Sequence, residues 1–279
     1  MAQSSSLPAP VEAAPDRLTF IAISALAYIT AAGLHEHLGH TLACILLGSH
    51  PTEIGAFYVN CDYTGMSDLS IRLVALAGPL VSLLLGLVSF SILRRRPPRS
   101  YAVYYFVWLL GSIALMAATG YLLFSGITGI GDFGTSRDGL IYQAAPELLW
   151  RILLTLAGTA SYAYVAYIAV RTIDPHIRGE GRRRIRYASL MALTSYLTGA
   201  CVSIAIGLFN PHGLVIVLSS SAASSLGASS GLLWMMQWLD RKRQVSSPGL
   251  TFRRSWAWIA AGAVVTILYA LVLGPTLHP

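Results

Sequence analysis

Residues 71–93 read IRLVALAGPLVSLLLGLVSFSIL, with Arg72 as the single charged side chain. About 20 consecutive apolar residues suffice for a helix to cross the hydrocarbon core of a bilayer. The whole chain shares this character, since 55% of its 279 residues are hydrophobic and only 11% are charged, against about 25% in soluble domains. Its mean hydropathy is +0.62. This composition excludes a disordered chain, argues against a soluble enzyme and indicates an integral membrane protein.

Apolar stretches of similar length recur along the chain. They cover residues 18–47, 71–93, 101–125, 148–170, 187–209, 214–239 and 256–273. The sequence therefore predicts an all-α fold, a polytopic membrane helix bundle of about seven transmembrane helices. In this interpretation residues 18–274 form a single transmembrane domain. Residues 1–17 lack the features of a cleaved signal peptide and are expected to form a disordered N-terminal tail.

Basic residues are distributed unevenly between the segments that join these stretches. If the N-terminus lies inside, the inner segments hold 16 of the 19 Lys and Arg residues, which leaves Arg72, Arg137 and Arg151 outside. Cytoplasmic loops collect Lys and Arg, so this split predicts a cytoplasmic N-terminus. The positive charge is then explained by orientation and by attraction to anionic membrane lipids, and no nucleic-acid partner is expected. Arg outnumbers Lys by 18 to 1, which favours a GC-rich bacterial genome and hence the bacterial cytoplasmic (inner) membrane.

The first outer loop, residues 48–70, is too polar to span a membrane. Its Phe57-Tyr58-Val59 segment indicates a short strand or β-hairpin at the outer interface. Cys61 has no obvious partner in this loop, because Cys44 and Cys201 both fall within predicted spans. Three cysteines without a CxxC pair exclude a disulfide scaffold and indicate no thiolate zinc site.

The segment GLHEHLGHTLA, residues 33–43, places three histidines and one glutamate inside the first apolar stretch. Ionisable side chains are costly in or near hydrocarbon, and there they usually mark a functional site. Neutral imidazole and carboxylate are also ligands suited to zinc. The alternative is that these side chains lie at a water-exposed helix end. An apolar run from Thr41 to Leu47 follows directly, which favours the functional interpretation.

The spacing of the histidines departs from the HExxH pattern, in which two histidines four residues apart share one helix face. His35 and His40 are five residues apart, and on a regular α-helix they diverge by about 140°. A wide turn of π-helix would aim both at one ion, and Gly39 would ease that distortion. Without such a turn, Glu36 and His40 are four residues apart and could bind the metal together, with His37 as base or third ligand.

Three motifs resemble those of the site-2 protease family of intramembrane zinc metalloproteases. Residues 35–43, HEHLGHTLA, look like the family's HELGHAL-type helix. Residues 75–84, ALAGPLVSLL, are similar to its AGP-containing helix, with Ser82 where Asn is usual. Residues 131–134, GDFG, follow the third span, where the family brings in an aspartate ligand. The resemblance covers roughly residues 30–135, and it departs from the family in the histidine spacing and in a site that the charge pattern places near the outer face.

The resemblance implies a metalloprotease-like core at residues 18–135, with additional helices at 148–274. It implies one Zn²⁺ ion bound by His35, His40 and Asp132, with Glu36 as the catalytic base. His37 remains the alternative ligand or base. The implied activity is a zinc metalloendopeptidase that hydrolyses a peptide bond in or near the membrane, and the implied substrate is a transmembrane or membrane-proximal polypeptide.

Five further residues are candidates for lining a cleft at this site. They are Gly39 in the histidine motif, Gly78 and Pro79 in the AGP motif, and Asn210 and His212 in a predicted outer turn. Two competing functions use the same segment. One is a non-catalytic metal-binding membrane protein, a transporter or sensor built on the His/Glu cluster, and the other is a structural scaffold that retains the motif without activity.

Overall fold

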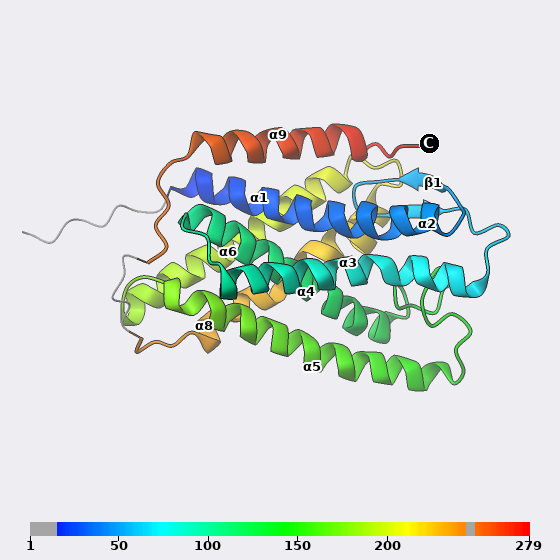
Figure 1. Cartoon of the computed structure of the whole chain (residues 1–279), viewed down its shortest axis with the longest axis horizontal. Coiled ribbons are helices and arrows are strands. Elements are labelled where there is room, and N and C mark those ends of the chain that lie inside the picture. Colours follow the sequence, from blue (N-terminus) through cyan, green and yellow to red (C-terminus); the bar gives the residue numbers. More distant parts are fainter. Residues whose placement is uncertain (1–15, 244–248) are drawn as a thin grey trace, which may run out of the picture.

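The computed structural model describes residues 16–243 and 249–279 as a bundle of long helices with one small sheet (Figure 1). The α-helices are α1 (Arg17–Gly33), α2 (Leu42–Leu46), α3 (Asp68–Arg95), α4 (Tyr101–Thr128), α5 (Glu147–Ile173), α6 (Gly181–Gly207), α7 (Leu214–Ile216), α8 (Met235–Trp238) and α9 (Trp256–Leu273). The π-helices are η1 (Leu34–Thr41), η3 (Val217–Ser221) and η4 (Ala223–Gly227), and the 3₁₀-helices are η2 (Asp174–His176) and η5 (Ser230–Trp234). The strands are β1 (Pro51–Ile54) and β2 (Val59–Cys61).

Seven helical segments in the described part of the chain are long and apolar enough to cross a membrane, as the sequence predicts. They are Arg17–Leu46, Asp68–Arg95, Tyr101–Thr128, Glu147–His176, Gly181–Gly207, Leu214–Trp234 and Trp256–Leu273. The predicted N-terminal tail lies outside the described residues except for its last two. Asp16 caps α1, because its carboxylate accepts a hydrogen bond from the backbone N–H of Thr19 at 3.0 Å, and Arg17 begins the helix.

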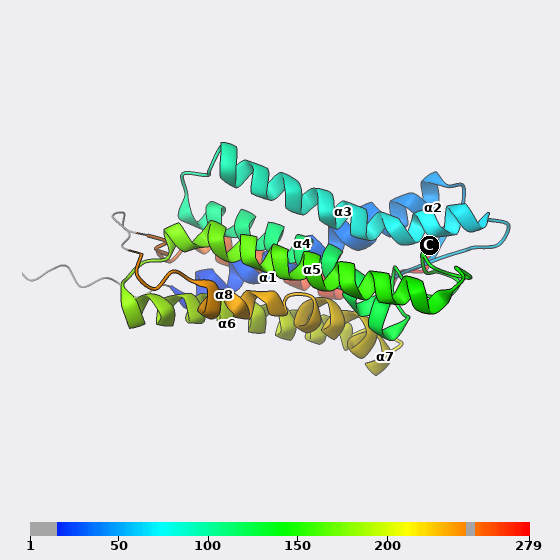
Figure 2. The same ribbon diagram turned by 90° about the horizontal axis from the view of Figure 1, so that it is seen from below.

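Helix α4 lies at the centre of the bundle and packs against α1, α3 and α5. It carries large side chains that are fully buried, including Tyr105, Trp108 and Met116. The indole N–H of Trp108 donates to the carbonyl of Ala169 at 2.9 Å, which fixes α5 beside α4. Helix α9 lies at the edge of the bundle beside α1, whereas α3 and α6 lie on opposite sides of α4 (Figures 1 and 2). The core therefore surrounds α4, and the loop that follows α4 carries Asp132.

The span from Leu214 to Trp234 differs from the other spans because most of it is not α-helical. It consists of one short α-helical turn followed by η3, η4 and η5. Its sequence is rich in serine, alanine and glycine, which lack the long apolar side chains that hold a regular helix against its neighbours. The hydroxyls of Ser219 and Ser225 donate to the carbonyls of Val215 and Ser221, four residues back. Such hydrogen bonds to the preceding turn compete with the backbone hydrogen bonds of a regular helix and often bend it.

The predicted hairpin is present in the first loop, where β1 and β2 pair antiparallel. Val59 lies in β2, and Phe57 and Tyr58 lie in the connection between the strands. The backbone N–H and C=O of Ile54 also pair with those of Leu277, both at 2.9 Å. The segment after α9 thus lies along the open edge of β1.

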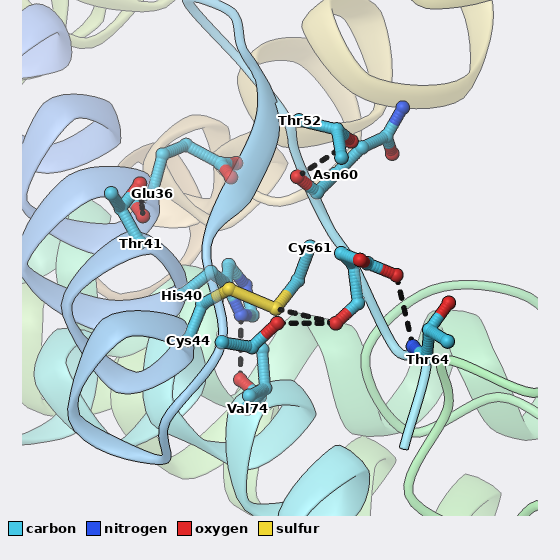
Figure 3. Close-up of a disulfide and its surroundings, with 11 residues drawn as sticks. Glu36, His40, Thr41, Cys44, Thr52, Asn60, Cys61, Thr64 and Val74 are labelled. Atoms are coloured by element: carbon cyan, nitrogen blue, oxygen red, sulfur yellow. Dashed lines mark hydrogen bonds between the residues drawn. A yellow bond between two sulfur atoms is a disulfide. The ribbon is translucent and has the colours of Figure 1, made fainter. Parts of the chain in front are cut away.

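Cys61 is paired with Cys44 in a disulfide, a pairing that the sequence does not predict (Figure 3). Cys44 lies in α2, at the C-terminal end of the first span, where strand β2 passes beside it. The bond therefore ties the hairpin to the helix that carries the histidine cluster, four residues after His40. Cys201 is free and exposed.

Replacing Cys61 with serine should destabilise this end of the bundle. The disulfide closes a loop with a sequence separation of 17, and loop-closure entropy assigns about 3 kcal/mol to a loop of that length. Thermal unfolding of the detergent-solubilised protein measures the effect, and Cys201→Ser serves as the control that should leave the melting temperature unchanged. Equal melting temperatures for both variants would show that the disulfide does not contribute to stability.

Candidate metal centre

The helix that carries the histidine cluster contains the wide turn that the spacing predicts. From Leu34 to Thr41 the backbone is π-helical, and the backbone N–H of Leu42 bonds to the carbonyl of His37, five residues back. One extra residue in the turn brings side chains at positions i and i+5 to the same face. His35 and His40 consequently face each other, with their Nε2 atoms 3.2 Å apart.

Asp132 completes a group of three side chains from two distant parts of the chain. Its Oδ2 lies 3.3 Å from Nε2 of His35 and its Oδ1 lies 3.5 Å from Nε2 of His40. These three residues, His35, His40 and Asp132, could hold a metal ion, and we call them the metal group. Both histidines are buried, so the group lies inside the bundle.

The loop after α4 folds Asp132 back onto the histidine helix. Gly129 ends α4 with a left-handed φ of 79°, and Gly131 repeats this conformation with a φ of 85°. Only glycine adopts such angles without strain. The backbone C=O of Asp132 then accepts from the N–H of Leu140 at 2.9 Å, and Arg72 of α3 donates to the carbonyl of Tyr142 at 2.8 Å. The aspartate is thus held by a folded loop attached to α3.

Each histidine ring is oriented by a hydrogen bond on its other nitrogen. Nδ1 of His40 lies 2.8 Å from the carbonyl oxygen of Val74 (Figure 3), and Nδ1 of His35 lies 2.9 Å from Oγ of Ser82. Since a carbonyl can only accept, Nδ1 of His40 carries the proton and Nε2 presents its lone pair. Second contacts of this kind set the tautomer and the ring angle of metal-binding histidines.

Gly78 of α3 leaves the space that the two imidazoles occupy. A Cβ atom at this position would collide with Nε2 of His40 and lie 2.7 Å from Nε2 of His35. Gly39 of η1 crosses α3 at the same point, because a Cβ there would lie 2.6 Å from Cα of Gly78. Pro79 is buried in α3 next to this crossing. The glycines of both motifs are therefore required by a close helix approach at the metal group.

The spacing of the two histidine nitrogens fits a tetrahedral ion. Zinc bonds of 2.0–2.1 Å in tetrahedral geometry place the ligand atoms about 3.3 Å from one another, and the two Nε2 atoms are 3.2 Å apart. One carboxylate oxygen of Asp132 lies 3.3 Å from Nε2 of His35, and the other lies 3.5 Å from Nε2 of His40. Oδ2 of Asp132 is buried without a hydrogen bond in the described part of the chain. A carboxylate and two aimed nitrogens form a donor set that a divalent cation satisfies.

Glu36 lies outside the group of three and lines an adjoining cavity of about 30 Å³ together with His35. A cavity of this size has room for about two water molecules. The walls also include Ser82 and Tyr121. The ring of Tyr121 stacks on that of His35, with centroids 5.2 Å apart and planes 11° apart. The carboxylate is thus beside the metal group, in a space that admits water.

His37 does not join the group of three. Its ring lies beside that of Tyr269 in α9, with centroids 6.3 Å apart. Its Nε2 is buried without a hydrogen-bond partner among the described residues. The alternative in which Glu36 and His40 bind the ion together needs a regular helix over these residues, and the π-helix does not provide one.

Asn210 and His212 contact the segment after α9 and the hairpin formed by β1 and β2. Nδ2 of Asn210 donates to Oγ1 of Thr276 at 2.8 Å, and Nε2 of His212 lies 3.3 Å from Oε2 of Glu53. Slight burial would raise the pKa of the Glu53 carboxyl, but hydrogen bonds from His212, Tyr58 and Asn60 hold that pKa below its usual value. His212 therefore contacts the hairpin through Glu53, and Asn210 contacts the segment after α9 through Thr276.

No protein-family model, curated protein or solved structure matches this chain. The resemblance to site-2 proteases accordingly stays a prediction that rests on the three motifs. The structure assigns the chain to the class of all-helical membrane proteins with a buried His/His/Asp group that could hold a metal ion.

Proposed function

We propose that this protein is a membrane-embedded zinc metallopeptidase, resembling site-2 proteases, that hydrolyses a peptide bond in or near the membrane. The observation that carries the proposal is the convergence of His35, His40 and Asp132 in a group that could hold a metal ion, with Glu36 in the adjoining cavity. Three protein ligands leave a fourth position for water or substrate, which is typical of catalytic sites, whereas structural sites are closed by four.

The residues of the chain have distinct roles in this reaction. A zinc ion held by His35, His40 and Asp132 would polarise the scissile carbonyl and lower the pKa of a water molecule. Glu36 accepts the proton from the attacking water and passes it to the leaving amine nitrogen. Ser82 and the carbonyl of Val74 keep the two imidazoles aimed. The surrounding helices exclude bulk water, which strengthens each of these electrostatic interactions.

A cleavage assay with metal removal tests this proposal. Transmembrane peptides in lipid vesicles should be cleaved by the purified protein, cleavage should stop after treatment with a chelator, and added Zn²⁺ should restore it. A non-catalytic transporter or sensor is the second candidate, since a cavity of about 30 Å³ is too small for a peptide in the described conformation. Bound metal without cleavage of any peptide would favour that candidate, and cleavage that is insensitive to chelation would refute the metallopeptidase.

The proposal includes an orientation, with the N-terminus in the cytoplasm of a bacterial cell and the metal group toward the outside. The distribution of basic residues supports it. The Cys44–Cys61 disulfide supports it independently, because disulfides persist in oxidising compartments and are rare in the cytosol. Both observations support an outer location for the hairpin end of the bundle.

Cysteine labelling in intact cells should reach the hairpin end and not the opposite end. Single cysteines at Arg137 and at Arg182, both exposed positions, are introduced into a Cys201→Ser background, and a membrane-impermeant maleimide is added. We expect labelling at position 137, and at position 182 only after the cells are opened. Labelling at position 182 in intact cells would reverse the orientation.

A further inference from the structure

A second, larger cavity of about 450 Å³ adjoins the one that contains Glu36. It lies between α4, α5 and the span from Leu214 to Trp234, and we call it the lateral cavity. Its volume is in the range of about 300–1,000 Å³ that ligand sites usually have. Tyr121 and Ser224 line both cavities. A ligand in the lateral cavity that extends past Tyr121 therefore reaches the space beside His35.

The walls of the lateral cavity favour a bulky apolar group. Phe124, Ile127 and Leu218 supply large apolar side chains, and its lining contains no charged residue. The wall formed by the Leu214–Trp234 span carries small residues, including Ala223 and Gly227. A Cβ atom added at Gly227 would meet nothing within 4 Å. The missing side chain at this glycine thus contributes open space to the cavity.

The polar groups where the two cavities meet favour a polypeptide over a lipid chain. Ser224 lines both cavities, and His35 and Glu36 line the smaller one beyond it, so the amide groups of a peptide find hydrogen-bond partners there, whereas an acyl chain offers none. The π-helices η3 and η4 form one wall of the lateral cavity. Tyr162 holds this wall in place, because its hydroxyl donates to the carbonyl of Ala228 and accepts from the N–H of Gly231, both at 2.7 Å. A peptide can place an apolar side chain in the cavity while its amide groups face Ser224 and the water-sized cavity beyond.

We propose that the lateral cavity is a specificity subsite that receives a bulky apolar side chain, such as leucine, adjacent to the scissile bond of a polypeptide substrate. The inference rests on the proposed function, because the metal group defines where the scissile bond lies. Tyr121 separates the two cavities and stacks on His35, so it positions the substrate between the subsite and the metal group. Substrates with alanine at this position leave the subsite unfilled.

Binding of two small hydroxamates to the zinc-loaded protein tests this subsite without an activity assay. The probes are N-acetyl-leucine hydroxamate and N-acetyl-alanine hydroxamate, which share a metal-chelating group and differ in the side chain. Burial of the three extra carbons of leucine should make its dissociation constant roughly 10- to 100-fold lower in the wild-type protein. Gly227→Leu places a side chain in the cavity and should reduce this preference, while the affinity for the alanine probe stays unchanged and reports that the variant is folded. Ala160→Leu, on the exposed face of α5, is the matched control and should keep the preference.

The outcomes separate the subsite from the metallopeptidase. If neither probe binds, the metal centre is absent and the inference fails with it. If both probes bind equally, or if Gly227→Leu keeps the leucine preference, the subsite is refuted and the metal centre stands. Loss of a co-purified phospholipid from Gly227→Leu, without a leucine preference in the wild type, would assign the cavity to an acyl chain and also overturn the proposal.

Discussion

Replacing Glu36 with glutamine is expected to slow peptide hydrolysis by at least about 100-fold, the usual contribution of a positioned general base. Glutamine keeps the size of the side chain but cannot accept a proton from water. The metal content should stay near that of the wild type, because Glu36 lies outside the group formed by His35, His40 and Asp132. Cleavage rates on a transmembrane peptide and elemental analysis of the same preparations measure both quantities.

A second carboxylate provides the control for this experiment. Glu147 lies at the start of α5, is more than half exposed and pairs with Arg151, so Glu147→Gln should change neither cleavage nor metal content. If Glu36→Gln loses its metal as completely as His40→Ala, Glu36 is a ligand and the general-base mechanism is wrong. If Glu36→Gln cleaves at the wild-type rate, another group removes the proton.

Replacing Gly78 with alanine is expected to remove most of the bound metal, although no ligand is changed. The new methyl group would occupy the place of Nε2 of His40 and lie 2.7 Å from Nε2 of His35. Because η1 and α3 are already in close contact at Gly39 and Gly78, either the histidine rings must move or the two helices must separate. Displacement of a ligand atom by about 1 Å is enough to lose a tetrahedral site that requires distances within about 0.2 Å.

Gly120→Ala in α4 is the matched control for this substitution. A Cβ there would meet its nearest neighbour, Ala228, at 3.6 Å, which is an ordinary contact. Its metal content and melting temperature should equal those of the wild type. A Gly78→Ala protein that binds a full complement of metal would show that the histidines do not converge at α3.

The transmembrane helices and the shape of the histidine turn could be predicted from the sequence. Apolar runs of spanning length follow directly from the thickness of the bilayer, and all seven are present. The five-residue separation of His35 and His40 predicts the π-helix, because a regular helix would aim them apart. The sequence predicts Asp132 as a ligand only through the family resemblance, because the position of this residue depends on how the loop after α4 folds back.

Features that depend on contacts between distant segments could not be predicted. Cys44 and Cys61 looked unrelated because one lies in a span and the other in a loop, yet the hairpin returns beside the helix end. Tyr121 lies in the middle of an apolar run, and only tertiary packing places its ring on His35. Asn210 and His212 were candidates for the cleft, whereas their polar atoms bind Thr276 and Glu53. The sequence contains no local signal for any of these pairings.

Elemental analysis of the purified protein and its ligand variants tests the central claim most directly. The wild type should hold about one divalent ion per chain, as a single three-ligand site requires. His40→Ala and Asp132→Ala should each lose most of that ion, and Asp138→Ala, an exposed position in the same loop, should retain it. A metal content that is unchanged in Asp132→Ala and His40→Ala would contradict the account, because the group that converges in the structure would then not be a metal site.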